Sequence, residues 1–193
     1  MKKNLTVEAT FDLAVKSYQE KKFHIAEKLY KEVLKTHPNH ANTYVNLGMV
    51  LKKLEKYKEA VNCYESAIKI NPNDSNPHYN LANLYKGFDK YEEAINFYNN
   101  AIHINPNHLS AYNNLGNVFK DLGEYNKAIT CYNKAIQINP NSADVYNNLG
   151  LSYRKIGKSK LSVDSYQKAL AKRTNIKLDV ENKLLPATTF FFS

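Results

Sequence analysis

The feature that most constrains this chain is a motif that returns every 34 residues. Proline marks the period, at Pro38, Pro72, Pro106 and Pro140. Three other residue types recur in the same register: Leu13, Leu47, Leu81, Leu115 and Leu149; Ala26, Ala60, Ala94 and Ala128; and Tyr30, Tyr64, Tyr98, Tyr132 and Tyr166. A fixed period of about 20–50 residues is the signature of repeat architectures. The chain is therefore predicted to be a stack of copied repeats rather than a globule around one central core.

Five repeats fit this period: residues 7–40, 41–74, 75–108, 109–142 and 143–176. Each has two stretches in which apolar residues recur at spacings of three and four, as at Tyr44, Leu47 and Leu51 and then at Tyr57, Val61 and Tyr64. Spacing of this kind predicts two amphipathic helices. Glycine or polar residues separate the two stretches, and proline ends the second because its nitrogen carries no donor for the helix ladder. Each repeat is therefore expected to be a helix–turn–helix.

The order of an aromatic residue, Leu-Gly, an aromatic, Ala, an aromatic, Ala and Pro resembles the tetratricopeptide repeat (TPR) and covers residues 7–176. The resemblance implies an all-α fold, a right-handed α-solenoid of five 34-residue helix–turn–helix units. The outer repeats depart from the pattern, with Thr10 in place of an aromatic and Ser159, Ser162 and Thr174 in place of Tyr, Ala and Pro. Atypical outer repeats are what a finite array requires.

The ends of the chain lie outside these repeats. Residues 1–6 are expected to form an N-terminal tail, and residues 177–185 a short capping helix that covers the fifth repeat and stops before Pro186. The alternative is that residue 177 begins a sixth repeat. Residues 186–193, which include Phe190–Phe192, are expected to be an apolar tail.

Charge and cysteine usage narrow the partners and the compartment. The formal net charge is +9, which attracts acidic partners, nucleic acid included. Cys63 and Cys131 occupy the same position two repeats apart, beyond the reach of a disulfide, so both are expected to be free thiols. No apolar run approaches the roughly 20 residues that span a bilayer, and polar residues interrupt the N-terminus where a signal peptide would be apolar. We expect no membrane partner and an intracellular protein, cytoplasmic or, as an alternative, nuclear.

The sequence offers little for catalysis. Its six histidines fall at unrelated positions of the repeat and lack Cys or carboxylate companions at metal-ligand spacing. No glycine-rich phosphate loop, nucleophile elbow or paired-histidine metalloprotease motif is present in the sequence. We therefore expect a protein that is not an enzyme and that holds no metal and no cofactor.

Asparagine recurs on the helices that, in the TPR family, line a concave face and take up peptides. Asn46, Asn80, Asn114 and Asn148 each precede the signature leucine, and Asn83 and Asn117 follow the small residue after it. One amide offers both a donor and an acceptor to a peptide backbone without reading a side chain. These residues form the predicted peptide-binding asparagine set. The alternative is a solvated row in a chain rich in asparagine.

A basic row stands six residues beyond the asparagines, at Lys52, Lys86, Lys120 and Arg154. Together the two rows predict a groove that holds the backbone of an extended segment and prefers acidic flanks. The alternative is a solvated basic stripe. A clamp of the kind that TPR proteins use for the acidic tails of chaperones is disfavoured, because Asp144 carries the wrong sign at one clamp position.

The sequence thus predicts an interaction scaffold that binds an extended peptide segment of another protein. Residues 112–117, Tyr-Asn-Asn-Leu-Gly-Asn, are also similar to the TPR arm of O-linked N-acetylglucosamine transferases. That similarity makes the substrate-recognition or regulatory arm of a multi-subunit enzyme, such as a glycosyltransferase, the alternative function. RNA binding is a weaker alternative, since the basic row supplies only about four phosphate contacts and RNA-reading helical repeats lack this framework.

Overall fold

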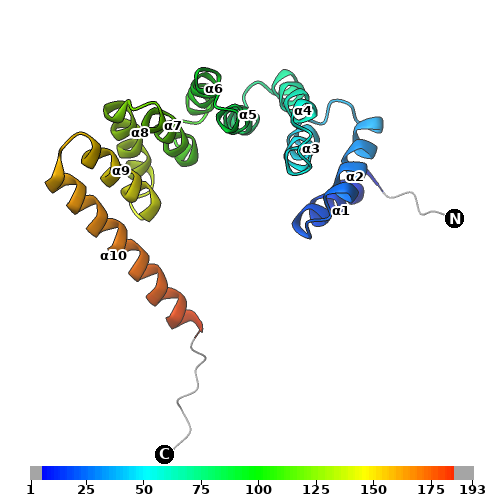
Figure 1. Cartoon of the computed structure of the whole chain (residues 1–193). Coiled ribbons are helices and arrows are strands. Elements are labelled where there is room, and N and C mark those ends of the chain that lie inside the picture. The colour runs from blue at the N-terminus through cyan, green and yellow to red at the C-terminus, as the bar shows by residue number, and fades with distance from the viewer. Residues whose placement is uncertain (1–5, 185–193) are drawn as a thin grey trace, which may run out of the picture. The chain divides into compact units, whose positions relative to one another are not determined.

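The computed structural model describes residues 6–184, with side chains up to residue 174. The described residues form ten α-helices and no strand, so the predicted all-α fold is confirmed (Figure 1). The first helices of the successive pairs are α1 (Val7–Gln19), α3 (Ala41–Lys53), α5 (Ser75–Gly87), α7 (Leu109–Asp121) and α9 (Ala143–Lys155). The second helices are α2 (Phe23–Thr36), α4 (Tyr57–Ile70), α6 (Tyr91–Ile104), α8 (Tyr125–Ile138) and α10 (Ser159–Leu184).

One backbone conformation makes the turn between the two helices of every pair. The second residue after each first helix has a positive φ, between 56° and 76°, at Lys21, Glu55, Asp89, Gly123 and Gly157. The amide of the next residue then bonds back to the helix, as from Lys56 N to Leu51 O at 2.9 Å. This Schellman arrangement gives a partner to a carbonyl that the end of a helix would otherwise leave unpaired. The same local geometry therefore returns the chain against its first helix in all five repeats.

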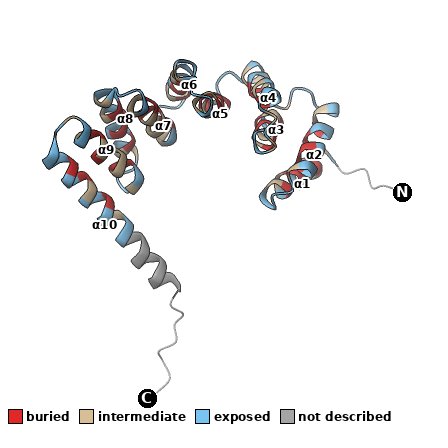
Figure 2. Ribbon diagram, viewed as in Figure 1, coloured by how far each residue is buried: buried red, intermediate tan, exposed pale blue. Residues whose placement is uncertain are grey.

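The chain divides between Pro106 and Asn107 into two compact units, each described here by itself. In the first unit, consecutive helices from α1 to α6 pack against each other, and α3 also contacts α1 and α5. In the second unit, consecutive helices from α7 to α10 pack against each other, and α9 also contacts α7. Buried residues follow the packed sides of the helices, and exposed residues the outer sides (Figure 2). Within each compact unit the first helices therefore lie side by side.

A tyrosine and a small residue make the closest approach within a helix pair. Tyr64 and Tyr132 are buried between their two helices. A Cβ placed on Gly48 would lie 2.5 Å from Cε1 of Tyr64, and one on Gly116 would lie 2.6 Å from Cε1 of Tyr132. Such distances are too short for a side chain. Glycine at these positions lets the first helix lie directly against the ring, which explains why the small residue and the tyrosine recur together.

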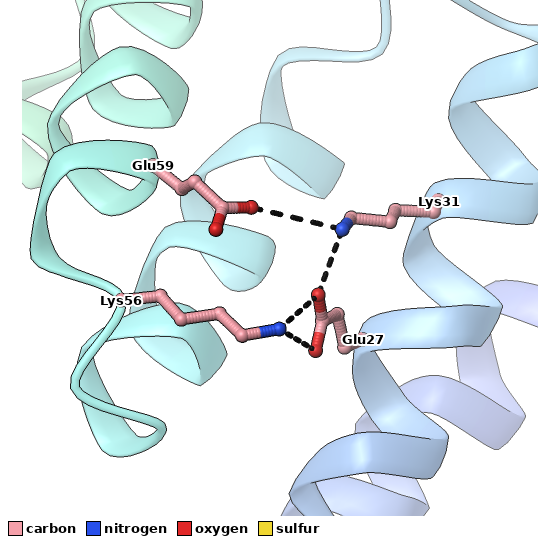
Figure 3. A network of polar contacts seen from close by, with 4 residues as sticks. All are labelled: Glu27, Lys31, Lys56 and Glu59. Carbon is pink, nitrogen blue, oxygen red and sulfur yellow. Dashed lines mark hydrogen bonds and ion pairs between the residues drawn. The ribbon is translucent and has the colours of Figure 1, made fainter.

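Four charged side chains join the first two repeats (Figure 3). Glu27 on α2 is buried, and its carboxylate lies 2.7 Å from Lys31 Nζ and 2.9 Å from Lys56 Nζ. The carboxylate of Glu59 lies 3.7 Å from Lys31 Nζ. Burial acts to raise the pKa of Glu27, but the hydrogen bonds from the two lysines outweigh burial and hold the pKa below its ordinary value. The residues that align with Glu27 in the other repeats are all apolar: Val61, Ile95, Ile129 and Val163.

The C-terminal helix differs from the prediction. The sequence predicts a separate capping helix at residues 177–185, whereas α10 continues without a break from Ser159 to Leu184. The physical reason is Thr174, which stands where proline ends the other second helices. Its Oγ1 donates a hydrogen bond to the Leu170 carbonyl at 3.1 Å, within the same helix. Residues 1–5 and 185–193, with the predicted apolar tail at Phe190–Phe192, lie outside the described residues.

Candidate functional site

The first helices of the first compact unit line a groove of about 420 Å³. Four asparagines contribute to its wall, Asn42 and Asn46 from α3 and Asn76 and Asn80 from α5. Asn46 and Asn80 belong to the predicted peptide-binding asparagine set. The structure thus brings these two members to one wall.

Apolar side chains alternate with the amides along this wall. Phe11 from α1, Val45 and Met49 from α3 and Tyr79 from α5 line the same groove. Phe11, Val45 and Tyr79 share one register of the 34-residue period, one position before the predicted asparagines. Sequence reasoning missed these residues, although the same period carried to the neighbouring position identifies them.

A second cavity, of about 180 Å³, adjoins the groove, because Asn46 and Met49 line both. Its other walls come from α1 and α2, at Val15, Tyr18, Gln19 and Tyr30. Tyr18 holds in the first repeat the register position that the basic row holds in the later ones. The two cavities together are called the α1–α3–α5 groove below.

Asn46 and Asn80 differ in what their amides contact. Asn46 forms a hydrogen bond with the hydroxyl of Tyr30. Burial raises the pKa of Tyr30 to about 12, and the bond from Asn46 acts against that rise. Asn80 is half-buried, and its side-chain amide makes no hydrogen bond with another residue of the described part of the chain. Asn80 therefore presents a donor and an acceptor to the groove.

Asn83 and Asn117, the two predicted residues after the small position, contact buried tyrosines. The hydroxyl of Tyr98 donates to Oδ1 of Asn83 at 2.6 Å, and that of Tyr132 donates to Oδ1 of Asn117 at 2.8 Å. A buried hydroxyl without a partner costs free energy, so these amides stabilise the helix pairs in which they lie. Neither residue lines the α1–α3–α5 groove.

In the second compact unit, the predicted asparagines are joined by an asparagine that sequence reasoning did not select. Nδ2 of Asn148 donates to Oδ1 of Asn113 at 3.2 Å, and Nδ2 of Asn113 lies 3.5 Å from Oδ1 of Asn114. A chain of amides therefore runs from α9 to α7. Asn113 shares the register of Phe11, Val45 and Tyr79, so the same neighbouring position carries the signal.

The basic row lies apart from the groove lining. Lys52 and Lys86 follow the lining residues of α3 and α5 farther along the same helices, and within the described residues neither lines the α1–α3–α5 groove. The charged side chain that does line it is Asp74, at the N-cap of α5. Desolvation, together with the neighbouring charge of Lys53, lowers the pKa of Lys52.

The basic residues of the second compact unit have different surroundings. Lys120 Nζ lies 3.7 Å from the carboxylate of Asp121 on the same helix. Arg154 is exposed near the end of α9. Asp144, the residue that disfavours a chaperone-tail clamp, accepts a hydrogen bond from Nη2 of Arg173 on α10 at 2.9 Å. A residue of the same chain therefore neutralises that carboxylate.

Other chemistry is sparse among the described side chains. No group of three or more His, Cys, Asp or Glu residues is placed to hold a metal ion in that part of the chain. Cys63 and Cys131 are free, as predicted, and the structure shows that both are buried. Burial raises the pKa of each thiol to about 11, so both stay protonated at neutral pH. None of the described helices combines the length and the apolar character needed to cross a bilayer.

Three family profiles match the sequence. A profile described as TPR repeat matches residues 89–123 and 116–157, and two described as tetratricopeptide repeat match residues 41–74 and 63–96. Together they cover most of the repeats that the 34-residue period defines. No curated protein sequence matches the chain.

Solved structures share the fold. A crystal structure of MamA is 29% identical, covers 85% of this chain and 96% of its own, and has a TM-score of 0.78. A structure of MamA from residue 41 to its end, from Desulfovibrio magneticus RS-1, is 18% identical. The match covers 88% of this chain and 96% of that chain, with a TM-score of 0.77. YrrB, described as a TPR protein with an unusual peptide-binding site, is 20% identical, covers 92% and 91%, and scores 0.69.

Proposed function

This chain belongs to the tetratricopeptide repeat family, and from that premise we propose that it is an interaction protein whose α1–α3–α5 groove binds an extended peptide segment of a partner. The observation that carries the proposal is the composition of one wall. Asn46 and Asn80 lie there beside apolar residues, and the side-chain amide of Asn80 has no hydrogen-bond partner in the described residues. A half-buried amide of this kind is best satisfied by a ligand that brings its own donor and acceptor.

A peptide in extended conformation meets these requirements. Its N–H and C=O groups bond to asparagine amides, while its alternate side chains enter the apolar spaces beside Val45, Met49 and Tyr79. A few hydrogen bonds of about 1 kcal/mol each, set against the costs of association, give micromolar affinity. YrrB, which shares the fold, is described as having a peptide-binding site, and this supports the class of ligand rather than particular residues.

Charge differs between the two sides of the groove. Asp74 lines the groove at the start of α5, whereas Lys52 and Lys86 follow the lining toward the ends of α3 and α5. We therefore propose that acidic side chains of the partner point toward the lysine side of the groove and that neutral side chains face Asp74. The acidic preference of the partner thus applies to one flank of the segment.

The test starts from a peptide-display selection against the full chain, followed by calorimetry with a selected peptide. Asn80→Ala removes an amide that has no structural partner, so the fold should be kept and binding should weaken about fivefold, the equivalent of one hydrogen bond. Asn100→Ala, on the exposed side of α6, is the matched control and should bind like wild type. Equal affinity of the Asn80→Ala variant and wild type would contradict the proposed groove.

A further inference from the structure

The first and last repeats of the array expose large apolar side chains. At the N-terminal end these are Leu13 of α1 and Ile25 of α2. At the C-terminal end they are Leu161, Val163 and Leu170, all on α10. For Leu13, Val163 and Leu170, the 34-residue period identifies equivalents inside the array that are buried or half-buried. The equivalents of Ile25 and Leu161 are the exposed charged residues Glu59, Glu93 and Lys127.

Val163 and Leu170 hold the positions by which a second helix packs against the next repeat. Their equivalents on α8, Ile129 and Ile136, are half-buried and share an apolar cluster with Leu149 of the following helix α9. On α10 the same positions are 53% and 64% exposed. The difference arises because no repeat follows α10 in the described residues.

Leu13 is the complementary case. Its equivalents Leu47, Leu81 and Leu149 are 3%, 0% and 5% exposed, and each follows a second helix against which its own helix packs. Leu13 is 42% exposed, because in the described residues no second helix precedes α1. The side of α1 that carries Leu13 is thus the kind of surface against which a second helix such as α10 packs.

The two faces are therefore the separated halves of an interface that the chain already forms at α2–α3, α4–α5 and α8–α9. We propose that the α10 face of one copy docks on the α1–α2 face of a second copy, so that the second copy takes the place of a sixth repeat. Each face lies within its own compact unit, so the proposal does not depend on how the two units are arranged. It is also independent of peptide binding.

The polar positions of the junction are compatible with this docking. Between the first two repeats, Glu27 contacts Lys56, and Lys31 contacts Glu59 (Figure 3). In a junction between copies, Val163 of one copy takes the place of Glu27 and faces Lys22 of the second copy, which aligns with Lys56. Gln167 likewise takes the place of Lys31 and faces Ile25, which aligns with Glu59. Neither of these two pairs joins like charges, and Ile25 offers apolar surface where the inner junction has the carboxylate of Glu59.

Such an interface is heterologous, because it joins two different faces, and it leaves one free face at each end of the assembly. It therefore predicts self-association that grows with protein concentration. The probe is sedimentation velocity of the full chain, with the 22.2 kDa monomer as the reference. Leu13→Glu and Leu170→Glu each remove one face at an exposed position, so each variant alone should stay folded and monomeric.

Mixing these two variants gives the decisive result. Each retains the face that the other lacks, so an equimolar mixture should form a 1:1 dimer and grow no further, whereas neither variant associates alone. Leu122→Glu, at an exposed apolar residue outside both faces, is the control and should associate like wild type. A wild-type chain that remains monomeric at all concentrations would overturn the proposal. Association that survives either face variant, or face variants that do not pair when mixed, would do the same.

Discussion

At the scale of single residues, the turn within each repeat depends on one backbone angle. Gly123 and Gly157 have the positive φ that glycine adopts readily, yet Lys21, Glu55 and Asp89 hold it as well. The sequence indicated a short connection at all five positions, and glycine was a visible signal at two of them. It could not show that charged residues share the conformation, because the Schellman hydrogen bonds of the packed helix pair impose it.

Two glycines separate this backbone effect from packing. Gly123 and Gly87 both have open space where a Cβ would be placed, but only Gly123 has a positive φ. Gly123→Ala should therefore lower the free energy of unfolding by about 1 kcal/mol, the cost of the left-handed conformation for a residue with a Cβ. Gly87→Ala, at the end of helix α5, should raise it by up to about 1 kcal/mol through helix propensity. Thermal denaturation of both variants checks the signs, and equal signs would contradict the explanation.

The predicted peptide-binding asparagine set also shows where the repeat pattern no longer predicts side-chain contacts. The period makes Asn46, Asn80, Asn114 and Asn148 equivalent. The structure joins Asn46 to Tyr30, links Asn148 to Asn114 through Asn113 and leaves Asn80 without a partner among the described residues. The link between Asn148 and Asn114 depends on Asn113, whose register position is aromatic or aliphatic in the first three repeats.

At the scale of elements, helix bounds were largely predictable because a regular 34-residue period fixes where each amphipathic stretch begins. The exception is α10, in which a threonine replaces the terminating proline and the helix runs on to Leu184. The network of charged side chains between α2 and the start of α4 was not predictable from the sequence either. Glu27 looks like an ordinary solvated residue in sequence, and only the packing of the first two repeats buries it between lysines.

Glu27→Gln should lower the free energy of unfolding at neutral pH by about 1–2 kcal/mol, a value discounted because both lysines are partly exposed. The pKa of Glu27 is lower in the folded chain than its ordinary value of 4.5. The stabilisation is therefore complete above pH 4.5 and is lost as the pH falls through the folded value. The difference in free energy of unfolding between wild type and Glu27→Gln should therefore shrink as the pH falls below 4.5.

Glu27→Val is the companion variant, since Val61 and Val163 occupy the equivalent position. Valine needs no hydrogen-bond partner at this buried position, whereas the glutamine amide does, so Glu27→Val should be closer to wild type in stability than Glu27→Gln is. Chemical denaturation across pH measures all three chains. A Gln variant as stable as wild type at neutral pH, or a difference that persists unchanged in acid, would contradict the account of this network.

At the scale of the whole molecule, the repeat architecture was predictable and the partner was not. Repetition reveals a stack of helix pairs, but the ligand depends on side chains that vary between copies. The basic row illustrates the point, since its members recur in register while the structure assigns the groove lining a carboxylate instead. The similarity of residues 112–117 to a glycosyltransferase arm stays a prediction, and so does RNA binding.

The central claim is that the α1–α3–α5 groove receives a peptide through its asparagines. Side-chain amide signals in a nuclear magnetic resonance titration of the full chain with a selected peptide test it most directly. The account predicts shifts for the amides of Asn46 and Asn80, with Asn62 on α4 and Asn100 on α6 unchanged. Shifts confined to Asn62 and Asn100, with Asn46 and Asn80 unmoved, would place the peptide on the second helices and contradict the account.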